Sequence, residues 1–159
     1  MEGSAGLLGS RATAAVDVAY LLLLAIVPLF VWSLESLPVR RNYLLHKRIQ
    51  LALTPPFLVA CGLLARGFLL EDWQARAVKA AGEVIAPVTR MTLVIHVAFL
   101  ATSLAIWVVL LVAALRRIPN PPGPCDFGRT YLFWIVLLGL QTFLAALTGW
   151  EFYMLAYCF

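Results

Sequence analysis

Four long apolar stretches, separated by short polar segments, dominate the pattern of residues along the chain. They cover residues 14–34, 49–70, 91–115 and 131–152. Each has the length, about 20 residues, that an α-helix needs to cross the hydrocarbon core of a bilayer. Because the connecting segments are short, consecutive spans are expected to run antiparallel. The pattern predicts an all-α fold: a single integral membrane domain over residues 1–159, built as a four-helix up-down bundle.

The first two stretches contain residues that hydrocarbon or a regular helix disfavours. Asp17 and Ser33 interrupt the first stretch, which is longer than the core of about 7–15 apolar residues in a secretory signal. We therefore expect a retained helix, with a signal anchor as the alternative. Pro55 and Pro56 fall inside the second stretch, where neighbouring helices can satisfy the carbonyls that prolines leave free.

A mixed segment separates the second and third stretches, between residues 71 and 87. Apolar residues such as Trp73, Ala77 and Val84 recur there at helical spacing, with charged residues between them. This pattern predicts a short amphipathic helix at the membrane interface, with a solvated loop as the alternative. Beyond the third stretch, the proline-rich residues 119–124 forbid further helix.

Composition supports a membrane protein and excludes a soluble enzyme or nucleic-acid-binding domain. Apolar residues make up 63% of the chain and charged residues 13%, and the mean hydropathy is +0.92. A soluble domain has about 25% charged residues to cover its surface. The net charge of +4 comes from basic residues beside the apolar stretches, where they anchor and orient helices. The expected partners are therefore the lipid bilayer and other membrane protein subunits, and no nucleic acid.

The distribution of lysine and arginine predicts the orientation of the spans. Basic residues near cytoplasmic ends outnumber those near the opposite ends in most membrane proteins. The first and third connections carry residues 40, 41, 47, 48, 116, 117 and 129, whereas the other side carries residues 11, 66, 76, 79 and 90. This bias places the first and third connections in the cytoplasm and both termini outside.

Ionisable residues within spans are costly, so each is a candidate for function. Asp17, Arg66, His96 and Glu151 each fall near the end of a span, and in an up-down bundle all four ends map to the outer third of the membrane. They could form one polar membrane cluster: a hydrogen-bonded network, a proton site, or a metal site with His96, Glu151 and Asp17 as ligands. The alternative is that each side chain reaches water separately.

The two histidines are candidate cofactor-binding residues, but in separate sites. His46 stands in a basic stretch at the inner start of the second helix, whereas His96 stands near the outer start of the third span. At 1.5 Å per residue their depths differ by roughly 20 Å. They cannot hold one haem or one metal ion together. We expect His46 to face headgroups or a loop, and His96, between Ile95 and Val97, to be the stronger candidate.

Motifs for catalysis are missing from the chain. We find no glycine-rich phosphate loop, no H-E-x-x-H and no G-x-S-x-G. Cys61, Cys125 and Cys158 form no C-x-x-C pair, and the role of Cys125 stays open. The sequence thus favours a protein without catalytic activity of its own.

Three stretches resemble a known family. Residues 40–48 read RRNYLLHKR, residues 95–101 read IHVAFLA, and Trp134 opens an apolar final span. Over residues 40 to 157 they resemble the small four-helix bacterial membrane proteins called domain of unknown function 420, some of which assist the assembly of haem-copper terminal oxidases. Family members carry further histidines near the outer end of the second span and in the loop before the fourth. Here residues 65–70 and 125–129 stand in those places without histidine.

The resemblance implies a multi-pass protein of the bacterial inner membrane. Its leading interpretation is a non-catalytic assembly factor or accessory subunit of a respiratory complex of the haem-copper oxidase type, or of another metallocofactor complex. One alternative is a redox protein that binds haem or copper through His96. A second is a small proton-linked transporter subunit built on Asp17, Arg66, His96 and Glu151.

Overall fold

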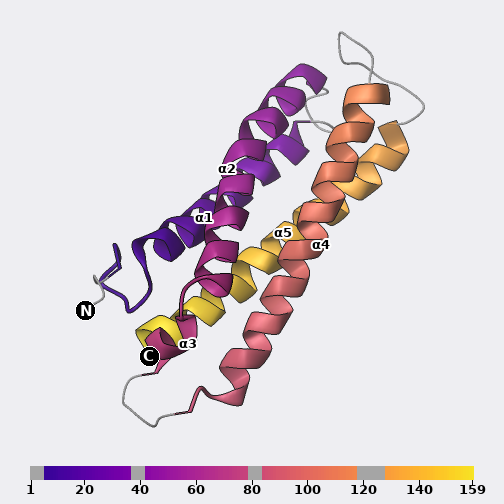
Figure 1. The fold of residues 1–159 in the computed structure, drawn as a ribbon. Coiled ribbons are helices and arrows are strands. Elements are labelled where there is room, and N and C mark those ends of the chain that lie inside the picture. Colours follow the sequence, from indigo (N-terminus) through magenta and orange to yellow (C-terminus); the bar gives the residue numbers. More distant parts are fainter. Residues whose placement is uncertain (1–5, 37–41, 79–83, 118–127) are drawn as a thin grey trace.

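The computed structural model describes residues 6–36, 42–78, 84–117 and 128–159, and within them it is helical without strands (Figure 1). The elements are α1 (Ala14–Glu35), α2 (Tyr43–Leu69), α3 (Trp73–Ala77), α4 (Pro87–Arg117), α5 (Gly128–Tyr153) and a terminal π-helical turn, η1 (Met154–Cys158). Four of these helices, including α5 with η1, are long and apolar enough to cross a membrane. The predicted all-α membrane architecture is confirmed.

Capping side chains explain where the helices begin. The Thr13 hydroxyl accepts from the backbone N–H of Val16 before α1, and the Asn42 side chain accepts from the N–H of Leu45 at 2.9 Å. Such caps satisfy donors that a helix start leaves free. Because of its cap, α2 begins at Tyr43, before the apolar run starts at Ile49. α4 begins at Pro87, where a missing N–H costs nothing.

The long helices form two antiparallel hairpins, α1 with α2 and α4 with α5. The hairpins are joined chiefly where α1 packs against α5. As Figure 1 shows, the N- and C-terminal ends lie at the same end of the bundle, as an even number of alternating spans requires. This is the predicted up-down arrangement.

Every long helix carries a run of buried positions in steps of three and four residues, or seven where a position is skipped. They include 16, 19, 23, 26, 30 and 33 in α1; 46, 50, 53, 57, 60, 64 and 67 in α2; 89, 92, 96, 103, 107 and 110 in α4; and 131, 135, 138, 142, 145, 149 and 152 in α5. A repeat of 3.5 residues produces left-handed, coiled-coil-like packing. We call these positions the bundle seam.

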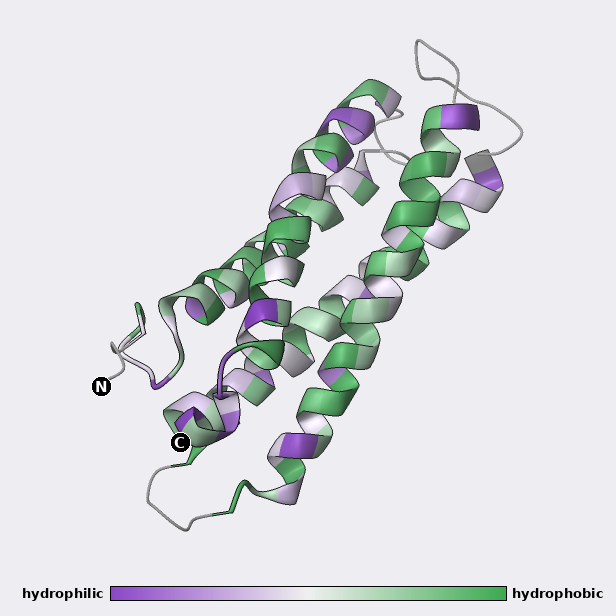
Figure 2. Ribbon diagram, viewed as in Figure 1, coloured by the Kyte–Doolittle hydropathy of each residue, from purple (hydrophilic) through white to green (hydrophobic). Residues whose placement is uncertain are grey.

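Polar side chains are concentrated in the seam rather than on the surface. Ser33, Gln50, Thr92, His96 and Ser103 are all buried, whereas many large apolar side chains, mostly leucine and valine, are exposed. Figure 2 shows the long helices as mostly hydrophobic along their length. Lipid tails are as apolar as leucine, so burial of apolar surface does not drive helices together in a bilayer, and close packing and interhelical hydrogen bonds take its place.

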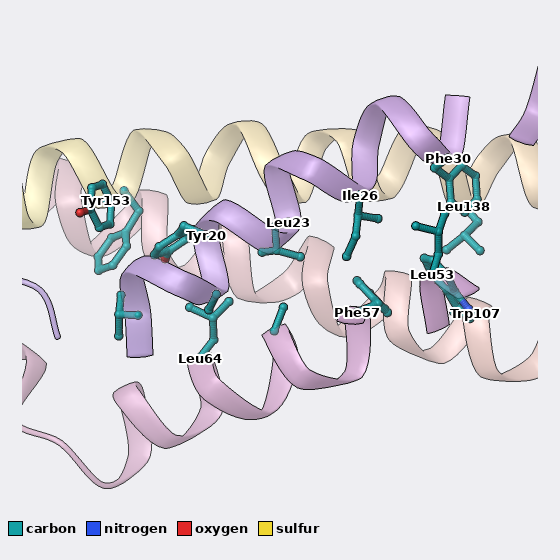
Figure 3. Close-up of a cluster of buried hydrophobic side chains, with 14 of the residues drawn as sticks. Tyr20, Leu23, Ile26, Phe30, Leu53, Phe57, Leu64, Trp107, Leu138 and Tyr153 are labelled. Atoms are coloured by element: carbon teal, nitrogen blue, oxygen red, sulfur yellow. The ribbon is translucent and has the colours of Figure 1, made fainter. Parts of the chain in front are cut away.

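An aromatic cluster joins the two hairpins, at the end of the core in Figure 3 that lies away from Tyr20 and Tyr153. The Trp107 ring of α4 stacks on Phe57 of α2 with centroids 4.4 Å apart, and it meets the Phe30 ring of α1 edge-on at 5.4 Å. Its indole N–H donates to Thr54 Oγ1 at 3.1 Å. Trp107 is therefore a core residue that connects α4 to two other helices, α1 and α2, through one side chain.

α3 is shorter than the predicted amphipathic helix between the second and third spans. It covers only Trp73–Ala77, it has no buried residue, and residues 79–83 of the predicted segment lie outside the described part of the chain. The Trp73 ring packs edge-on against Phe68 of α2 and Phe152 of α5. This contact holds α3 against the end of the bundle where the termini lie.

Candidate functional site

The structure separates the four residues of the predicted polar membrane cluster into two groups. Asp17, beside the seam position Val16, and His96, at a seam position, are completely buried at the end of the bundle where the termini lie. Arg66 and Glu151 are exposed. The four residues do lie toward one end of the bundle, but only Asp17 and His96 can take part in an interior site.

Asp17 accepts hydrogen bonds from three directions. Its Oδ2 accepts from the backbone N–H of Leu8 at 2.9 Å. Its Oδ1 accepts from the hydroxyl of Ser10 at 3.2 Å and from the hydroxyl of Tyr153 on α5 at 2.6 Å. A buried carboxylate requires such donors, because desolvation without them is expensive. Asp17 thus ties α1 to α5 and to the chain that precedes α1.

The chain before α1 folds into a compact turn over Gly6–Ala12, which we call the N-terminal turn. Gly9 has a positive φ of 72°, a conformation that other residues rarely adopt. Arg11 extends from this turn and donates through Nε and Nη2 to the carbonyls of Tyr157 and Ala156, both at 3.3 Å. The last carbonyls of a helix lack partners and attract cations. The two ends of the chain are therefore linked by Arg11 on one side and Asp17 on the other.

His96 is held in one orientation by α5 and α1. Its Nδ1 lies 2.9 Å from the carbonyl oxygen of Ala145, and because a carbonyl only accepts, Nδ1 carries the proton in this contact. A Cβ on Gly149 would lie 2.6 Å from Cε1 of the imidazole, so the ring packs directly on that glycine. The Nε2 atom is buried without a hydrogen-bond partner in the described chain.

Two tyrosines connect Asp17 with His96. The Tyr20 ring lies 5.7 Å from the imidazole of His96 and 5.3 Å from the ring of Tyr153, and Tyr153 donates to Asp17. The Tyr20 hydroxyl is itself buried without a partner among the described residues. Asp17, Tyr153, Tyr20 and His96 form a continuous set of contacts, which we call the outer cluster. Figure 3 places the two tyrosines close together at one end of the core.

Arg66 and Glu151 do not belong to this cluster: both are exposed, as in the alternative in which side chains near span ends reach water separately. The seam passes through Leu64 and Gly67 on α2, so Arg66 points away from the bundle. It pairs with Glu71, with Nε 3.5 Å from the carboxylate oxygen. Glu151 likewise lies between seam positions 149 and 152 and is exposed. Both residues lie toward the same end of the bundle as Asp17 and His96, but the helical phase directs their side chains outward.

The donor set does not fit a metal site built from His96, Glu151 and Asp17. Among the described residues, no three histidine, cysteine, aspartate or glutamate side chains are grouped closely enough to hold a metal ion. Asp17 directs both oxygens to other donors, and Glu151 faces outward. His96 offers a single unpartnered nitrogen, which fits one ligand position and no more. Cys125 lies outside the described residues.

His46 is buried within the bundle, not turned toward headgroups or a loop as predicted. Its Nδ1 lies 3.0 Å from the carbonyl oxygen of Ser33 and 2.9 Å from Ser33 Oγ. Its Nε2 lies 3.1 Å from the hydroxyl of Tyr131. Gln50, one turn along α2, donates to Ser33 Oγ at 3.1 Å. These four residues, the inner cluster, engage both imidazole nitrogens.

The inner cluster also satisfies a backbone carbonyl at the C-terminal end of α1. α1 ends at Glu35, so the carbonyl of Ser33 lacks its intrahelical partner. The Ser36 hydroxyl donates to this carbonyl at 2.6 Å, and Nδ1 of His46 is its second donor. A histidine at the start of α2 thereby caps the end of α1.

The two histidines lie in separate sites, as predicted. His46 contacts Tyr131, and His96 contacts the carbonyl of Ala145, on the same helix α5. The rise of an α-helix puts roughly 20 Å between those two positions of α5. Each histidine thus belongs to a polar cluster at a different end of the bundle.

Two serines of the seam provide a matched test of the inner cluster. Ser33→Ala removes the oxygen that His46 and Gln50 contact, and we expect it to lower the free energy of unfolding by about 1–2 kcal/mol. Ser103 is also completely buried, but its hydroxyl has no partner in the described chain. Ser103→Ala is expected to be neutral or slightly stabilising. Denaturation in mixed micelles measures both, and equal losses would contradict the assigned role of Ser33.

Several residues of the two clusters escaped the sequence analysis. Tyr131 and Gln50 lie in predicted spans without a role assigned to them, Tyr153 lies just beyond the fourth predicted span, and Gly149 was not expected to contact a histidine. Their common signal is spacing: Gln50 follows His46 by one turn, and positions 131 and 149 share the seam of α5. A search for polar and small residues in steps of three and four would have found them.

An open groove of about 510 Å³ lies beside the outer cluster, between the N-terminal turn and η1. Its walls include Leu8, Arg11, Trp150 and Met154. His96 is not among its lining residues, so the unpartnered nitrogen does not open into it.

Comparison with protein-family models, with curated proteins and with solved structures gives no match to this chain.

Proposed function

We propose that this chain is a non-catalytic membrane protein that acts as an assembly factor or accessory subunit of a larger membrane complex. The observation that carries the proposal is that its polar interior is largely engaged with itself. The oxygens of Asp17 and both nitrogens of His46 are bonded within the chain. A bundle of this kind offers other proteins its outer faces, where large apolar side chains are exposed.

The resemblance of three stretches to domain of unknown function 420 supports the kind of complex. Residues 40–48 and 95–101 carry His46 and His96, which are the central residues of the two clusters. We therefore propose a respiratory complex of the haem-copper oxidase type as the partner, or another complex that carries a metallocofactor. The proposed location is the bacterial inner membrane, with both termini outside, on the basis of the lysine and arginine distribution.

A second candidate function rests on the unpartnered Nε2 of His96. In this alternative the chain is a redox protein that binds haem or copper through His96. A bound haem or copper ion would supply electron transfer. The chain's own part would be to hold the imidazole through Ala145 and Gly149 with Nε2 free of a proton.

One purification distinguishes the two functions. The affinity-tagged chain is isolated from its native membrane in mild detergent, and its visible spectrum, metal content and bound proteins are measured for wild type, His96→Ala and Ser103→Ala. We expect subunits of a respiratory complex to co-purify in all three, and removal of the chain to lower the amount of assembled complex in the membrane. Ser103→Ala is the control for an altered seam.

Two results would contradict the assembly or accessory function. One is a chain that purifies without other subunits and whose removal leaves every respiratory complex at its normal level. The other is a stoichiometric Soret band or copper content that His96→Ala abolishes and Ser103→Ala preserves, which would establish the redox alternative.

A further inference from the structure

A polar pair faces outward halfway across the membrane. The hydroxyl oxygen of Thr102 on α4 lies 3.1 Å from Oε1 of Gln141 on α5 and 2.8 Å from the carbonyl oxygen of Ala98 on its own helix. Thr102 lies near the middle between Arg90 and Arg116, which flank the apolar part of α4. Gln141 lies near the middle of the apolar part of α5. Both residues are thus close to the bilayer midplane, where polar groups are most costly.

The pair leaves hydrogen-bonding capacity unused. The Nε2 atom of Gln141 carries two donors, and it has no hydrogen-bond partner among the residues that the structure describes. The contrast with Gln50 is direct, because that amide lies in the seam and donates to Ser33. Thr102 is exposed and Gln141 is half-buried. In hydrocarbon no water is present to satisfy the free N–H groups, so the amide favours a protein partner.

The helix around this pair is the least covered of the four spans. Only 17% of the most apolar stretch of α4 is buried, against 39% for α1. One row of exposed residues on α4 is spaced in steps of four and three, as the seam is. We call this row the α4 face: Val94, Ala98, Ala101, Ala105, Val108 and Val112. Figure 2 shows α4 as mostly apolar between its charged ends. The three alanines allow another helix to approach the backbone closely next to Thr102.

We propose that the α4 face, with Thr102 and Gln141, is the docking surface for a second copy of this chain. Two copies with the same orientation in a membrane are related by an axis along the membrane normal, so each residue meets residues of its own depth. The pair suits this geometry because donors and acceptors lie at one depth. Nε2 of Gln141 in one copy can donate to Oε1 of Gln141 or to Oγ1 of Thr102 in the other, and the reciprocal bond forms by symmetry.

The dimer does not depend on the proposed role in a larger complex. A partner of different sequence would need its own acceptor at the depth of Gln141, whereas a second copy brings one automatically. The purified chain alone is sufficient for the test, so its result is independent of the proposed function.

The test measures association of the full chain in liposomes. Singly labelled protein is diluted into phosphatidylethanolamine and phosphatidylglycerol vesicles, and the dimer fraction is counted by single-molecule photobleaching at decreasing protein-to-lipid ratios. We expect dimers in wild type and about a ten-fold weaker association in Gln141→Leu, because two symmetry-related hydrogen bonds are lost. Ala101→Phe should abolish dimers by blocking the close approach. Ala52→Phe, at an exposed alanine of α2, is the matched control and should leave the dimer intact.

Cross-linking locates the contact. In a background with the native cysteines replaced by serine, Ala105→Cys should form a disulfide-linked dimer under mild oxidation, and Ala52→Cys should not. The proposal is overturned if wild type is monomeric at every ratio, if Gln141→Leu dimerises as wild type does, or if both cysteines cross-link equally. It is also overturned if Ala105→Cys cross-links in native membranes only to a different protein, which would assign the α4 face to that protein.

Discussion

Replacing Asp17 with alanine is expected to lower the free energy of unfolding by about 3–5 kcal/mol. The substitution removes the acceptor for the N–H of Leu8, the hydroxyl of Ser10 and the hydroxyl of Tyr153. Asp17 and Tyr153 are buried. The Tyr153 hydroxyl would therefore lose its carboxylate acceptor without water to replace it. The N-terminal turn also loses its connection to α1. Titration of micelle-bound protein with a denaturing detergent, followed by tryptophan fluorescence, measures the loss.

Two comparison variants show whether the loss comes from the buried network. Asp17→Asn keeps one acceptor oxygen and should lie between wild type and Asp17→Ala. Asp72→Ala removes an aspartate that caps the exposed helix α3 through the N–H of Ala75, and it should cost at most about 1 kcal/mol. If Asp17→Ala were no more harmful than Asp72→Ala, the outer cluster would not be a stabilising element.

The membrane spans could be predicted from the sequence because each is a long run of consecutive apolar residues and needs no knowledge of tertiary contacts. A stretch of about 20 apolar residues has few other uses, and α1 and α4 contain the predicted runs with only their ends extended. The ends differ because caps, not hydropathy, determine where a helix starts. Asn42 extends α2 through the basic segment that includes His46, whose burial hydropathy did not predict.

The directions of individual side chains were harder to predict because lipid and protein interior are both apolar. In a soluble helix the polar side marks the exterior, but here the polar residues Gln50 and Ser103 point inward while leucine faces out. Asp17 and Arg66 looked equivalent in sequence, since each is a charge near a span end. Each is adjacent to a seam position, but Asp17 is buried one turn before the buried Tyr20 of α1, whereas Arg66 is exposed on α2.

The two polar clusters define how the hairpins fit together. The inner cluster joins α1, α2 and α5 through His46, and the outer cluster joins α1, α4 and α5 through Tyr20 and His96. Apolar contacts between leucine-rich helices tolerate sliding, but hydrogen bonds between named atoms do not. Clusters at both ends of the bundle therefore fix the relative height of the helices, with α1 and α5 common to both.

Gly149→Ala is expected to destabilise the bundle by about 2 kcal/mol, although alanine is the better helix former. The added Cβ would lie 2.6 Å from Cε1 and 2.8 Å from Nδ1 of His96, and 2.8 Å from Cε1 of Tyr20. Both rings are completely buried, so neither can move without disturbing the outer cluster. The hydrogen bond from His96 to the carbonyl of Ala145 should lengthen or break. Detergent unfolding and the NMR shift of the imidazole N–H report these two effects separately.

Gly62 supplies the matched control, because it is also a helix-interior glycine. A Cβ at Gly62 would meet no atom within 4 Å, so Gly62→Ala should stabilise the protein by up to about 1 kcal/mol through helix propensity alone. If Gly149→Ala destabilises the protein and Gly62→Ala stabilises it, the loss at Gly149 comes from the contact with His96 and not from replacing a glycine in a membrane helix. A stabilised Gly149→Ala would mean that α5 lies farther from α4 and α1 than the structure places it, and that His96 is free to turn.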